Sequence, residues 1–329
     1  MTPHVPSAVH VNDAAFTAHR LIAQARARGY RWDFLPRATR RPGRSGPSAV
    51  ARETMTGARW LARLKREQLR HDVVHIHSGT VLQHSRLVTR RYVLNCHGSD
   101  VRTQQYEPRW QALIRTGLVE AEAVFYPTPE LAEHVLPHRA DAVYLPIPVD
   151  VANLPRWQPV VGRPKVLFAS RWSSEKGGDV QLATALELVR AVGGRADVIG
   201  LDWGLGAAEA AGLGVRILPR MPHDQYLELL AASSVVIGQS AGILATSELE
   251  ALGMGAPLVL PVPMPWYEPT GAPLHGGSVT EAVDATLALL EDPQAHDAAA
   301  SIEYIDAHHG VQHAVDTVAA VYHRVVAAR

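Results

Sequence analysis

Short apolar runs alternate with stretches of helical periodicity along the first half of the chain. The runs cover residues 8–11, 72–77, 92–96 and 123–126, and apolar residues recur every three or four positions between them. Buried parallel strands appear as apolar runs, and strands that alternate with helices usually pair in parallel. This half therefore predicts a doubly wound parallel sheet.

The second half repeats the pattern after a proline-punctuated segment at residues 153–159. Its apolar runs cover residues 165–170, 196–200, 215–218, 235–238 and 257–260. Near the end, an apolar stripe at helical spacing comprises Val311, Val315, Val318, Tyr322 and Val325. We therefore expect an α/β protein with two Rossmann-like domains, residues 1–155 and 156–305, which face each other across a cleft. A C-terminal helix over residues 306–329 follows them.

Composition indicates a soluble globular protein whose halves differ in charge. Of the 329 residues, 47% are hydrophobic and 19% are charged. Residues 1–155 carry 21 Lys and Arg against 13 Asp and Glu, a balance of +8, whereas residues 156–329 carry 11 against 19, a balance of −8. The single cysteine, Cys96, excludes an internal disulfide framework and fits a reducing compartment. Because neither a secretory signal pattern nor a membrane-spanning apolar run is present, we expect a cytoplasmic protein.

The segment from Arg171 to Gly178 is the first candidate for a ligand site. It joins an apolar run to a helical pattern, so it connects a strand to a helix. Ligands of open parallel sheets bind beyond the carboxyl ends of the strands, where a helix N-terminus offers free N–H groups. Arg171 and Lys176 add a guanidinium fork and an ammonium, which together can hold a diphosphate from two sides. The alternative is a pair of solvated surface charges.

Six segments, in order, resemble motifs of the GT-B glycosyltransferases, specifically the large retaining family 4. In the first half these are residues 72–78, the His-Gly-Ser-Asp segment at 97–100 and the Leu-Pro-Ile-Pro-Val-Asp segment at 145–150. In the second half they are Arg171 with Lys176 and Gly177, residues 217–230, and residues 248–259. Their order and spacing cover nearly the whole chain and imply the GT-B architecture, in which the C-terminal helix packs back on the N-terminal domain.

The resemblance also implies a role for each matching position. Arg171 and Lys176 would hold the diphosphate of a nucleotide sugar and stabilise the departing nucleoside diphosphate. Glu250 would accept hydrogen bonds from the ribose hydroxyls, and His97 would face the transferred sugar unless it is a structural loop histidine. The other expected contacts are Leu218 and Pro219 at the base, Gln239, Ser240 and Gly242 near the sugar, and Asn12, Asp13 and Asp100 on the acceptor side. Asp100 has the alternative role of capping the next helix.

Two positions depart from that family. Eight positions before Glu250, where the family usually has a glutamate, this chain has Gly242, whose side chain cannot accept a proton or stabilise a cationic sugar. Gln239, Ser240 or a backbone amide would have to substitute, or the chemistry is weakened. The first strand also leads into Asn-Asp-Ala-Ala-Phe at residues 12–16 instead of a glycine-rich turn, which exposes less backbone to an acceptor or phosphate.

Three other patterns suggest different chemistry. Residues 238–242 match the GxSxG pattern of serine hydrolases, but the sharp turn from strand to helix is missing. His75 and His77 share a strand face, with His71 and His84 nearby, yet Asp72 points to the other face and no cysteine has ligand spacing. Residues 200–206 are glycine-rich but lack the GxGxxG spacing of a dinucleotide site. We therefore expect no metal and no cofactor apart from a nucleotide-sugar co-substrate.

A helix expected over residues 48–70 carries a stripe of arginines. Within roughly 60° of arc around the helix axis lie Arg52, Arg59, Arg63, Arg66 and Arg70. In one interpretation, this is the solvated outer face of a helix that packs on the sheet through its alanines. In the other, it docks an anion, either a phosphorylated acceptor or an anionic membrane in peripheral contact. No nucleic-acid partner is expected.

The predicted function is transfer of a sugar from a nucleoside-diphosphate sugar to an unidentified acceptor. Retention of the anomeric configuration is implied by the resemblance alone. The alternative is a GT-B scaffold that binds a nucleotide or glycan without transfer, which the missing glutamate favours.

Overall fold

The chain folds into two compact units. A computed structural model describes residues 5–37 and 47–329, without the side chains of residues 47–51. Unit 1 comprises Met1–Pro148 and Val311–Arg329, and unit 2 comprises Val149–Gly310. The boundaries therefore lie at 148/149 and 310/311, close to the 155/156 and 305/306 expected from the sequence. In the described part of the chain, no helix is long and apolar enough to cross a membrane.

Unit 1 is built on a six-stranded sheet with all neighbouring strands parallel, in the order β2-β1-β3-β4-β5-β6. Its strands are β1 (Ala8–Val11), β2 (Trp32–Leu35), β3 (Val73–His77), β4 (Val93–Asn95), β5 (Ala123–Tyr126) and β6 (Val143–Tyr144). Its helices are α1 (Thr17–Ala27), α2 (Pro47–Arg70), α3 (Leu82–Ser85), α4 (Ser99–Arg102), α5 (Gln111–Glu120), α6 (Ala132–Val135) and α13 (Val311–Ala327). The doubly wound parallel sheet predicted from the first half is confirmed.

Each face of the unit 1 sheet has its own hydrophobic core, because side chains alternate along a strand. Val9, Val74 and Leu94 belong to a cluster that includes residues of α2 and α5. Their neighbours Ala8, Val73 and Val93 belong to a second cluster that includes residues of α1 and α13. Both faces are thus covered, as the apolar character of parallel strands requires.

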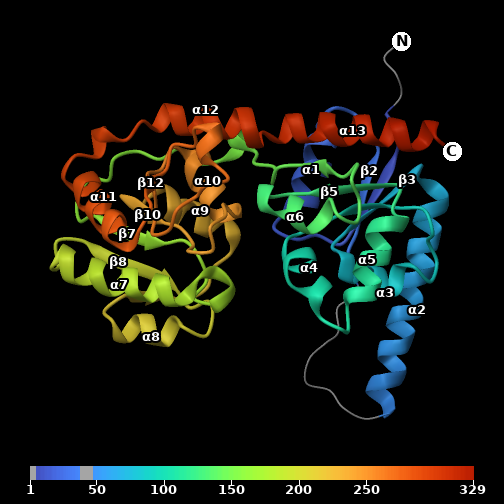
Figure 1. The fold of residues 1–329 in the computed structure, drawn as a ribbon, viewed down its shortest axis with the longest axis horizontal. Helices are drawn as coiled ribbons and strands as arrows, with labels where there is room; N and C mark the ends of the chain where they lie inside the picture. The colour runs from blue at the N-terminus through green and yellow to red at the C-terminus, as the bar shows by residue number, and fades with distance from the viewer. Residues whose placement is uncertain (1–4, 38–46) are drawn as a thin grey trace. The chain divides into compact units, whose positions relative to one another are not determined.

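The C-terminal helix α13 contributes to the core of unit 1. The buried side of α13 includes Val315, Val318 and Tyr322, which pack in the same cluster as Leu21 of α1 and Trp32 of β2. Figure 1 shows α13, coloured red, beside α1 over this face of the sheet. The last helix therefore stabilises strands that begin at the opposite end of the sequence.

Unit 2 has a second six-stranded parallel sheet, in the order β12-β11-β10-β7-β8-β9. Its strands are β7 (Lys165–Phe168), β8 (Asp197–Leu201), β9 (Arg216–Leu218), β10 (Val235–Ile237), β11 (Leu258–Leu260) and β12 (His275–Gly276). Its helices are α7 (Gly178–Val192), α8 (Ala207–Gly212), α9 (His223–Ala231), α10 (Thr246–Met254), α11 (Val279–Glu291) and α12 (Ala298–His309). The prediction for the second half is confirmed as well.

The face by which α2 packs differs from the one that the solvated-face interpretation assumed. The helix does not pack through its alanines, because Ala58 and Ala62 are exposed. It packs through Trp60 and Leu64, which belong to the core cluster, and Trp60 Nε1 donates a hydrogen bond to the carbonyl oxygen of Pro36 at 2.8 Å. Burying one tryptophan and one leucine removes far more apolar surface from water than burying alanines does. Figure 1 shows the first turns of α2 extending beyond the neighbouring helices of the unit.

We expect Val318→Ala in α13 to destabilise unit 1 by about 2 kcal/mol, because two buried methyl groups are lost and a small cavity remains. Hydrogen exchange followed by mass spectrometry should show faster exchange in β1, β3 and β4, with little change in β7 and β10. Gln312→Ala, on the exposed side of α13, is the control and should change stability by less than about 0.5 kcal/mol. Equal exchange in both variants would contradict the structural role of α13.

Candidate functional site

The strand order of unit 2 reverses between β7 and β10. From β7 the chain continues to β8 and β9 on one side and then returns to β10 on the other side of β7. Ligands of open α/β sheets bind outside the carboxyl ends of the strands at such switch points. Arg171 follows β7 and Gln239 follows β10, so the structure places two of the sequence-predicted residues at this point.

Backbone contacts fix the turn that carries Lys176. Gly177 is left-handed, with φ of 72°, and an added Cβ atom would lie 2.5 Å from the backbone oxygen of Ser240. The glycine thus allows close approach of the two loops, and Ser240 N donates to the Lys176 carbonyl at 2.9 Å. The Lys176 ammonium also donates to Gln239 Oε1 at 2.9 Å. The three sequence-predicted residues Lys176, Gln239 and Ser240 therefore lie together.

Arg171 is partly exposed at the same strand end. Its Nη2 atom lies 3.2 Å from Oε2 of Glu175, and the two side chains are 39% and 69% exposed. An exposed ion pair four residues apart contributes only about 0.3–0.5 kcal/mol. A phosphate group, which carries more charge and accepts a bidentate guanidinium, would therefore displace Glu175 at little cost.

Several buried polar atoms on these segments have no hydrogen-bond partner among the described residues. Among them are Arg171 Nε, Gln239 Nε2, Ser240 Oγ and Thr246 Oγ1. Such atoms are rare in folded proteins, and leaving one unpaired costs about 1–3 kcal/mol. Their concentration after β7 and β10 is the pattern expected where a polar ligand or ordered water completes the site.

A buried carboxylate shapes the loop that follows β10. Glu248 is fully buried, and its oxygens accept hydrogen bonds from the backbone N–H groups of Gln239 at 2.9 Å and Ala245 at 3.1 Å. Gly242 lies in this loop with φ of 70°, and apart from its chain neighbours no heavy atom of the described residues lies within 4 Å of the position of a Cβ. A glutamate at position 242 would have space but would adopt a backbone conformation that L-residues disfavour. The left-handed conformation of this loop thus suits the glycine at position 242.

Glu250 is paired with a histidine that the sequence did not indicate. The carboxylate is almost fully buried on α10, and its Oε1 atom is 2.9 Å from Nε2 of His223. His223 is the first residue of α9, and its side chain is 31% exposed. The exposed member of the pair is therefore the histidine.

Leu218 and Pro219 lie at the carboxyl end of β9, next to an exposed tryptophan. The Leu218 carbonyl accepts a hydrogen bond from Asp202 N at 2.8 Å. Trp203, in the segment after β8, is 37% exposed, and the Arg220 guanidinium lies 5.7 Å from the centroid of its ring. This aromatic surface was not predicted from the sequence, although a tryptophan shortly after an apolar run is a signal that could have indicated it.

In unit 1, the turn after β1 adopts glycine-like geometry without glycine. Asn12, Ala15 and Phe16 have positive φ angles of 69°, 54° and 60°. Asparagine tolerates this region, whereas alanine and phenylalanine are strained there. Asn12 Nδ2 donates to the carbonyl of His77 at 2.9 Å, and Asp13 Oδ1 accepts a hydrogen bond from the backbone N–H of Ala18 at 2.8 Å. These two predicted acceptor-side residues therefore fix the turn and the start of α1.

Asp100 holds the ends of two neighbouring strands together. Its carboxylate is buried and accepts hydrogen bonds from the backbone N–H groups of Gly79, His97 and Val101 at 2.9, 3.0 and 3.0 Å. Both oxygens thus accept hydrogen bonds from backbone N–H groups, and Asp100 lies within α4, whose N-cap residue is Gly98. His97 itself is partly exposed at the carboxyl end of β4.

Three buried histidines lie behind His97. The potential ligand atoms of His10, His75 and His77 are within 4.8 Å of one another, and all three residues are buried. Sequence alternation predicted that His75 and His77 share a face, but it did not bring in His10, whose Cα pairs with that of His75 across β1 and β3. Burial lowers the pKa of His10 to about 3 and those of His75 and His77 well below their ordinary 6.5.

Two other features lie apart from this chemistry. Ser240 Oγ has no hydrogen-bond partner among the described residues, so the GxSxG segment lacks the adjacent base of a serine hydrolase.

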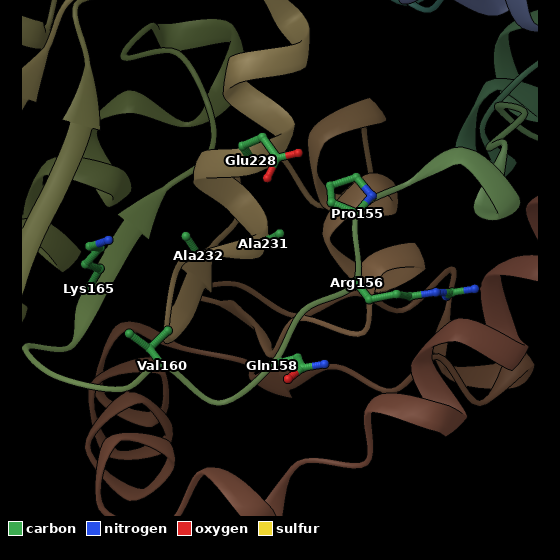
Figure 2. A pocket seen from close by; sticks show the side chains of 8 residues that line it. All are labelled: Pro155, Arg156, Gln158, Val160, Lys165, Glu228, Ala231 and Ala232. Atoms are coloured by element: carbon green, nitrogen blue, oxygen red, sulfur yellow. The ribbon is translucent and has the colours of Figure 1, made fainter.

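A pocket of about 300 Å³ lies at the amino end of β7, with Lys165, Arg156 and Glu228 among its lining residues. Figure 2 shows Lys165 at the start of β7 and Glu228 on α9. The pocket is lined by none of the predicted site residues.

No family model matches the sequence, and no curated protein matches it. Solved structures nevertheless match nearly the whole chain. Sucrose-phosphate synthase from Thermosynechococcus elongatus has a TM-score of 0.68 and 14% identity, over 98% of this chain and 100% of that one. HepE from Anabaena, in complex with UDP and glucose, has a TM-score of 0.67 and 14% identity, over 95% and 98%. AviGT4, a glycosyltransferase involved in avilamycin A biosynthesis, has a TM-score of 0.64 and 19% identity, over 98% and 99%.

These structures are GT-B glycosyltransferases, so the chain has the GT-B fold, as the resemblance implied. The likeness in structure, with TM-scores of 0.64–0.68 at identities of 14–19%, shows the fold of the chain.

The buried histidines predict that unit 1 loses stability in mild acid. Their pKa values are below 6.5 in the folded state, so the unfolded chain binds more protons as the pH falls. Above about pH 6.5 these histidines are neutral in the unfolded chain as well, so their burial does not make stability depend on pH. Below that pH, each buried histidine lowers the free energy of unfolding by up to about 1.4 kcal/mol per pH unit. Urea titrations from pH 7.5 to 5, read by hydrogen exchange in β1 and β3, should show this loss. Stability of unit 1 independent of pH in this range would contradict the burial of neutral histidines.

Proposed function

We propose that this protein is a glycosyltransferase that uses a nucleoside-diphosphate sugar as donor. The observation that supports this most is the site after β7 and β10, where Arg171 and Lys176 stand beside unpaired buried polar atoms. Two cations at the switch point of a parallel sheet suit a diphosphate. HepE, which has the same fold, was crystallised with UDP and glucose.

In this proposal, the two cations act on the leaving group. The bond between the anomeric carbon and the diphosphate oxygen breaks, and negative charge grows on the nucleoside diphosphate. The Arg171 guanidinium, released from Glu175, and the Lys176 ammonium stabilise that charge more strongly in the transition state than in the bound donor. The acceptor hydroxyl oxygen forms the new bond to the anomeric carbon, and its proton passes to the departing diphosphate oxygen.

The roles of the other residues in the proposal follow the resemblance. Glu250, with His223 as its exposed partner, accepts hydrogen bonds from the ribose hydroxyls. The backbone at Leu218 and Pro219 binds the base beside Trp203. His97 contacts the transferred sugar. Asn12 and Asp13 belong to the acceptor side through the turn that they fix.

Retention and rate depend on what replaces the usual glutamate. Gln239 Nε2 and Ser240 Oγ are unpaired polar atoms close to Gly242 in sequence. They can hydrogen-bond sugar hydroxyls, but neither carries the negative charge that would stabilise a cationic sugar. We therefore expect transfer with retention at a reduced rate. A scaffold that binds the nucleotide without transfer is the second candidate, because Gly242 supports it.

Donor binding and transfer can be tested separately. Thermal unfolding with a panel of nucleoside diphosphates should show stabilisation by the matching base, about 2.7 kcal/mol at 100 times the dissociation constant. Nuclear magnetic resonance of the product anomer from the matching donor sugars then reports transfer and stereochemistry. Binding without product would favour the scaffold, and the absence of any binding would overturn the donor site.

We expect Arg171→Ala and Lys176→Ala each to lower donor turnover on the order of 100-fold, because stabilisation of the leaving group is lost. Turnover of the donor to free nucleoside diphosphate, measured at saturating donor, is the readout. Arg190→Ala removes an exposed arginine of α7 that is paired with Glu187, and it should retain full turnover. If all three variants behave alike, the two cations do not bind the diphosphate.

We also propose that the arginine stripe of α2 docks unit 1 on an anionic surface, with a membrane as the occupant. The five arginines Arg52, Arg59, Arg63, Arg66 and Arg70 are all exposed. Beside them, Met55 and Leu69 are 54% and 77% exposed, because the helix packs through Trp60 and Leu64 instead. The exposed face thus combines cations with a little apolar surface, which suits peripheral contact without insertion.

Sedimentation with anionic and neutral vesicles tests this surface. Replacing Arg59, Arg63 and Arg66 by alanine should weaken binding to anionic vesicles on the order of 100-fold at low salt, because each cation contributes about 1 kcal/mol. The same change in charge at three other exposed arginines of unit 1, Arg90, Arg91 and Arg109, is the control. Equal losses in both variants would mean that net charge alone, and not the stripe, directs binding.

A further inference from the structure

Five polar side chains of unit 1, His75, Tyr322, His10, His77 and His97, form one continuous network, which we call the imidazole network. The Tyr322 hydroxyl lies 2.7 Å from His75 Nδ1 and 3.2 Å from His10 Nε2. His10 Nδ1 is 3.0 Å from His77 Nε2, and His77 Nδ1 is 3.1 Å from His97 Nε2. The network therefore runs from the buried core to the partly exposed residue at the end of β4.

Strand alternation and the C-terminal helix together create this network. Ala8 and Val73 lie on the sheet face that packs against α13, so His10, His75 and His77 fall on the same face two and four residues later. His97 lies four residues after Val93, which is also in that cluster. The helix α13 covers the face and supplies Tyr322 from 225 residues beyond His97.

The imidazole rings meet edge to edge where they form hydrogen bonds. The ring centroids of His10 and His77 are 5.2 Å apart, 2.2 Å more than the 3.0 Å between their nitrogens. For His77 and His97 the centroid distance is 5.3 Å, again 2.2 Å more than the 3.1 Å between nitrogens. The centroid distance can exceed the nitrogen–nitrogen distance by at most the sum of the two distances from nitrogen to ring centre. In both pairs the difference is close to that limit. Each pair of nitrogens therefore points along the line that joins the rings, as a hydrogen bond requires.

Counting donors leaves only two possible proton arrangements. A neutral imidazole has one N–H donor and one acceptor nitrogen, and the tyrosine hydroxyl has one O–H donor. His10 and His77 each use both nitrogens, so each donates once and accepts once. All hydrogen bonds must then run in one direction. Protons directed toward His97 give four histidines with Nδ1–H, and protons directed toward His75 give four histidines with Nε2–H.

The two ends of the network decide between these directions. His75 Nε2 is buried without a partner among the described residues. If the protons ran inward, it would carry an orphaned N–H, which is rarer in proteins than an under-satisfied acceptor. At the other end His97 is partly exposed, so an N–H directed outward there is open to solvent or to a ligand. The buried end therefore favours protons directed outward, and the exposed end permits them.

We propose that the imidazole network holds His97 in the Nδ1–H form, so that its free nitrogen presents a hydrogen-bond donor at the carboxyl end of β4. His10, His77 and Tyr322 are thus positioning residues that act on His97 from within the core. Free neutral histidine in water favours Nε2–H, so the fold imposes the opposite form. Only the use of this donor toward an oxygen of a bound sugar rests on the proposed function.

A metal ion bound by the same histidines is the competing explanation, because the potential ligand atoms of His10, His75 and His77 lie within 4.8 Å of one another. Both nitrogens of His10 and both nitrogens of His77 are within 3.0–3.2 Å of their partners in the imidazole network. A metal ion could therefore bind these two residues only by replacing hydrogen bonds of the network. The two explanations exclude each other at His10 and His77.

The tautomers can be measured directly in the full-length protein. Long-range proton–nitrogen correlation spectra of protein with ¹⁵N-labelled histidine distinguish Nδ1–H from Nε2–H, and single His→Gln variants assign the signals. At pH 7 we expect Nδ1–H at His10, His75, His77 and His97. Four Nε2–H signals, or a mixture, would overturn the proposal without any reference to donor turnover.

The variant His77→Leu removes the donor to His97 Nε2, and we expect His97 to shift to the Nε2–H form of free histidine. The control is Tyr92→Phe, which removes another buried hydroxyl of unit 1, one that is bonded to the Gly117 carbonyl at 3.1 Å. It should leave all four tautomers unchanged. If His77→Leu does not fold, the wild-type spectrum still decides. Stoichiometric zinc in the protein as isolated, measured by elemental analysis, would also overturn the proposal.

Discussion

Parallel strand pairing is the constraint on which the rest of the structure depends. Parallel strands joined by helices are covered on both faces, so most side chains of the sheet are apolar and fully buried. All carboxyl ends then lie along one edge of each sheet, and the segments that follow them carry the polar residues. In unit 2 this places Arg171 beside Gln239 and Ser240, and in unit 1 it places Asn12 beside His77 and His97.

At these edges the backbone limits which residues can act. Gly177 permits the approach of the β7 and β10 loops, whereas Gly242 is left-handed where a glutamate would be strained. The turn after β1 contains such strain, because Ala15 and Phe16 occupy the left-handed region. This conformation costs roughly 1–2 kcal/mol for each of these residues. Strain of this kind persists only where surrounding contacts hold it. Asn12 and Asp13 supply those contacts, so the turn keeps its shape without the usual glycines.

The sequence predicted the features that arise from local periodicity. Both parallel sheets and the strand-end position of Arg171 followed from apolar runs and their spacing. It could not predict features that depend on partners distant along the chain. His10 lies beside His75 only because of the register of β1 with β3. The helix α2 packs through Trp60 because this residue faces the core cluster, which the periodicity of the helix sequence did not indicate. The pairing of Glu250 with His223 likewise needs two helices that a periodic pattern cannot position.

The C-terminal helix links the stability of unit 1 to the chemistry of its strand ends. Tyr322 is fully buried among apolar residues of α13 and the sheet, so its hydroxyl has no access to water and must be satisfied by His10 and His75. The same burial that holds the helix in place thereby orders the protons of the network. Any change that loosens the packing of α13 admits water to Tyr322 and gives the histidines other partners. Which ring nitrogen of His97 carries the proton thus depends on the whole core of unit 1 and not on the loop that carries His97.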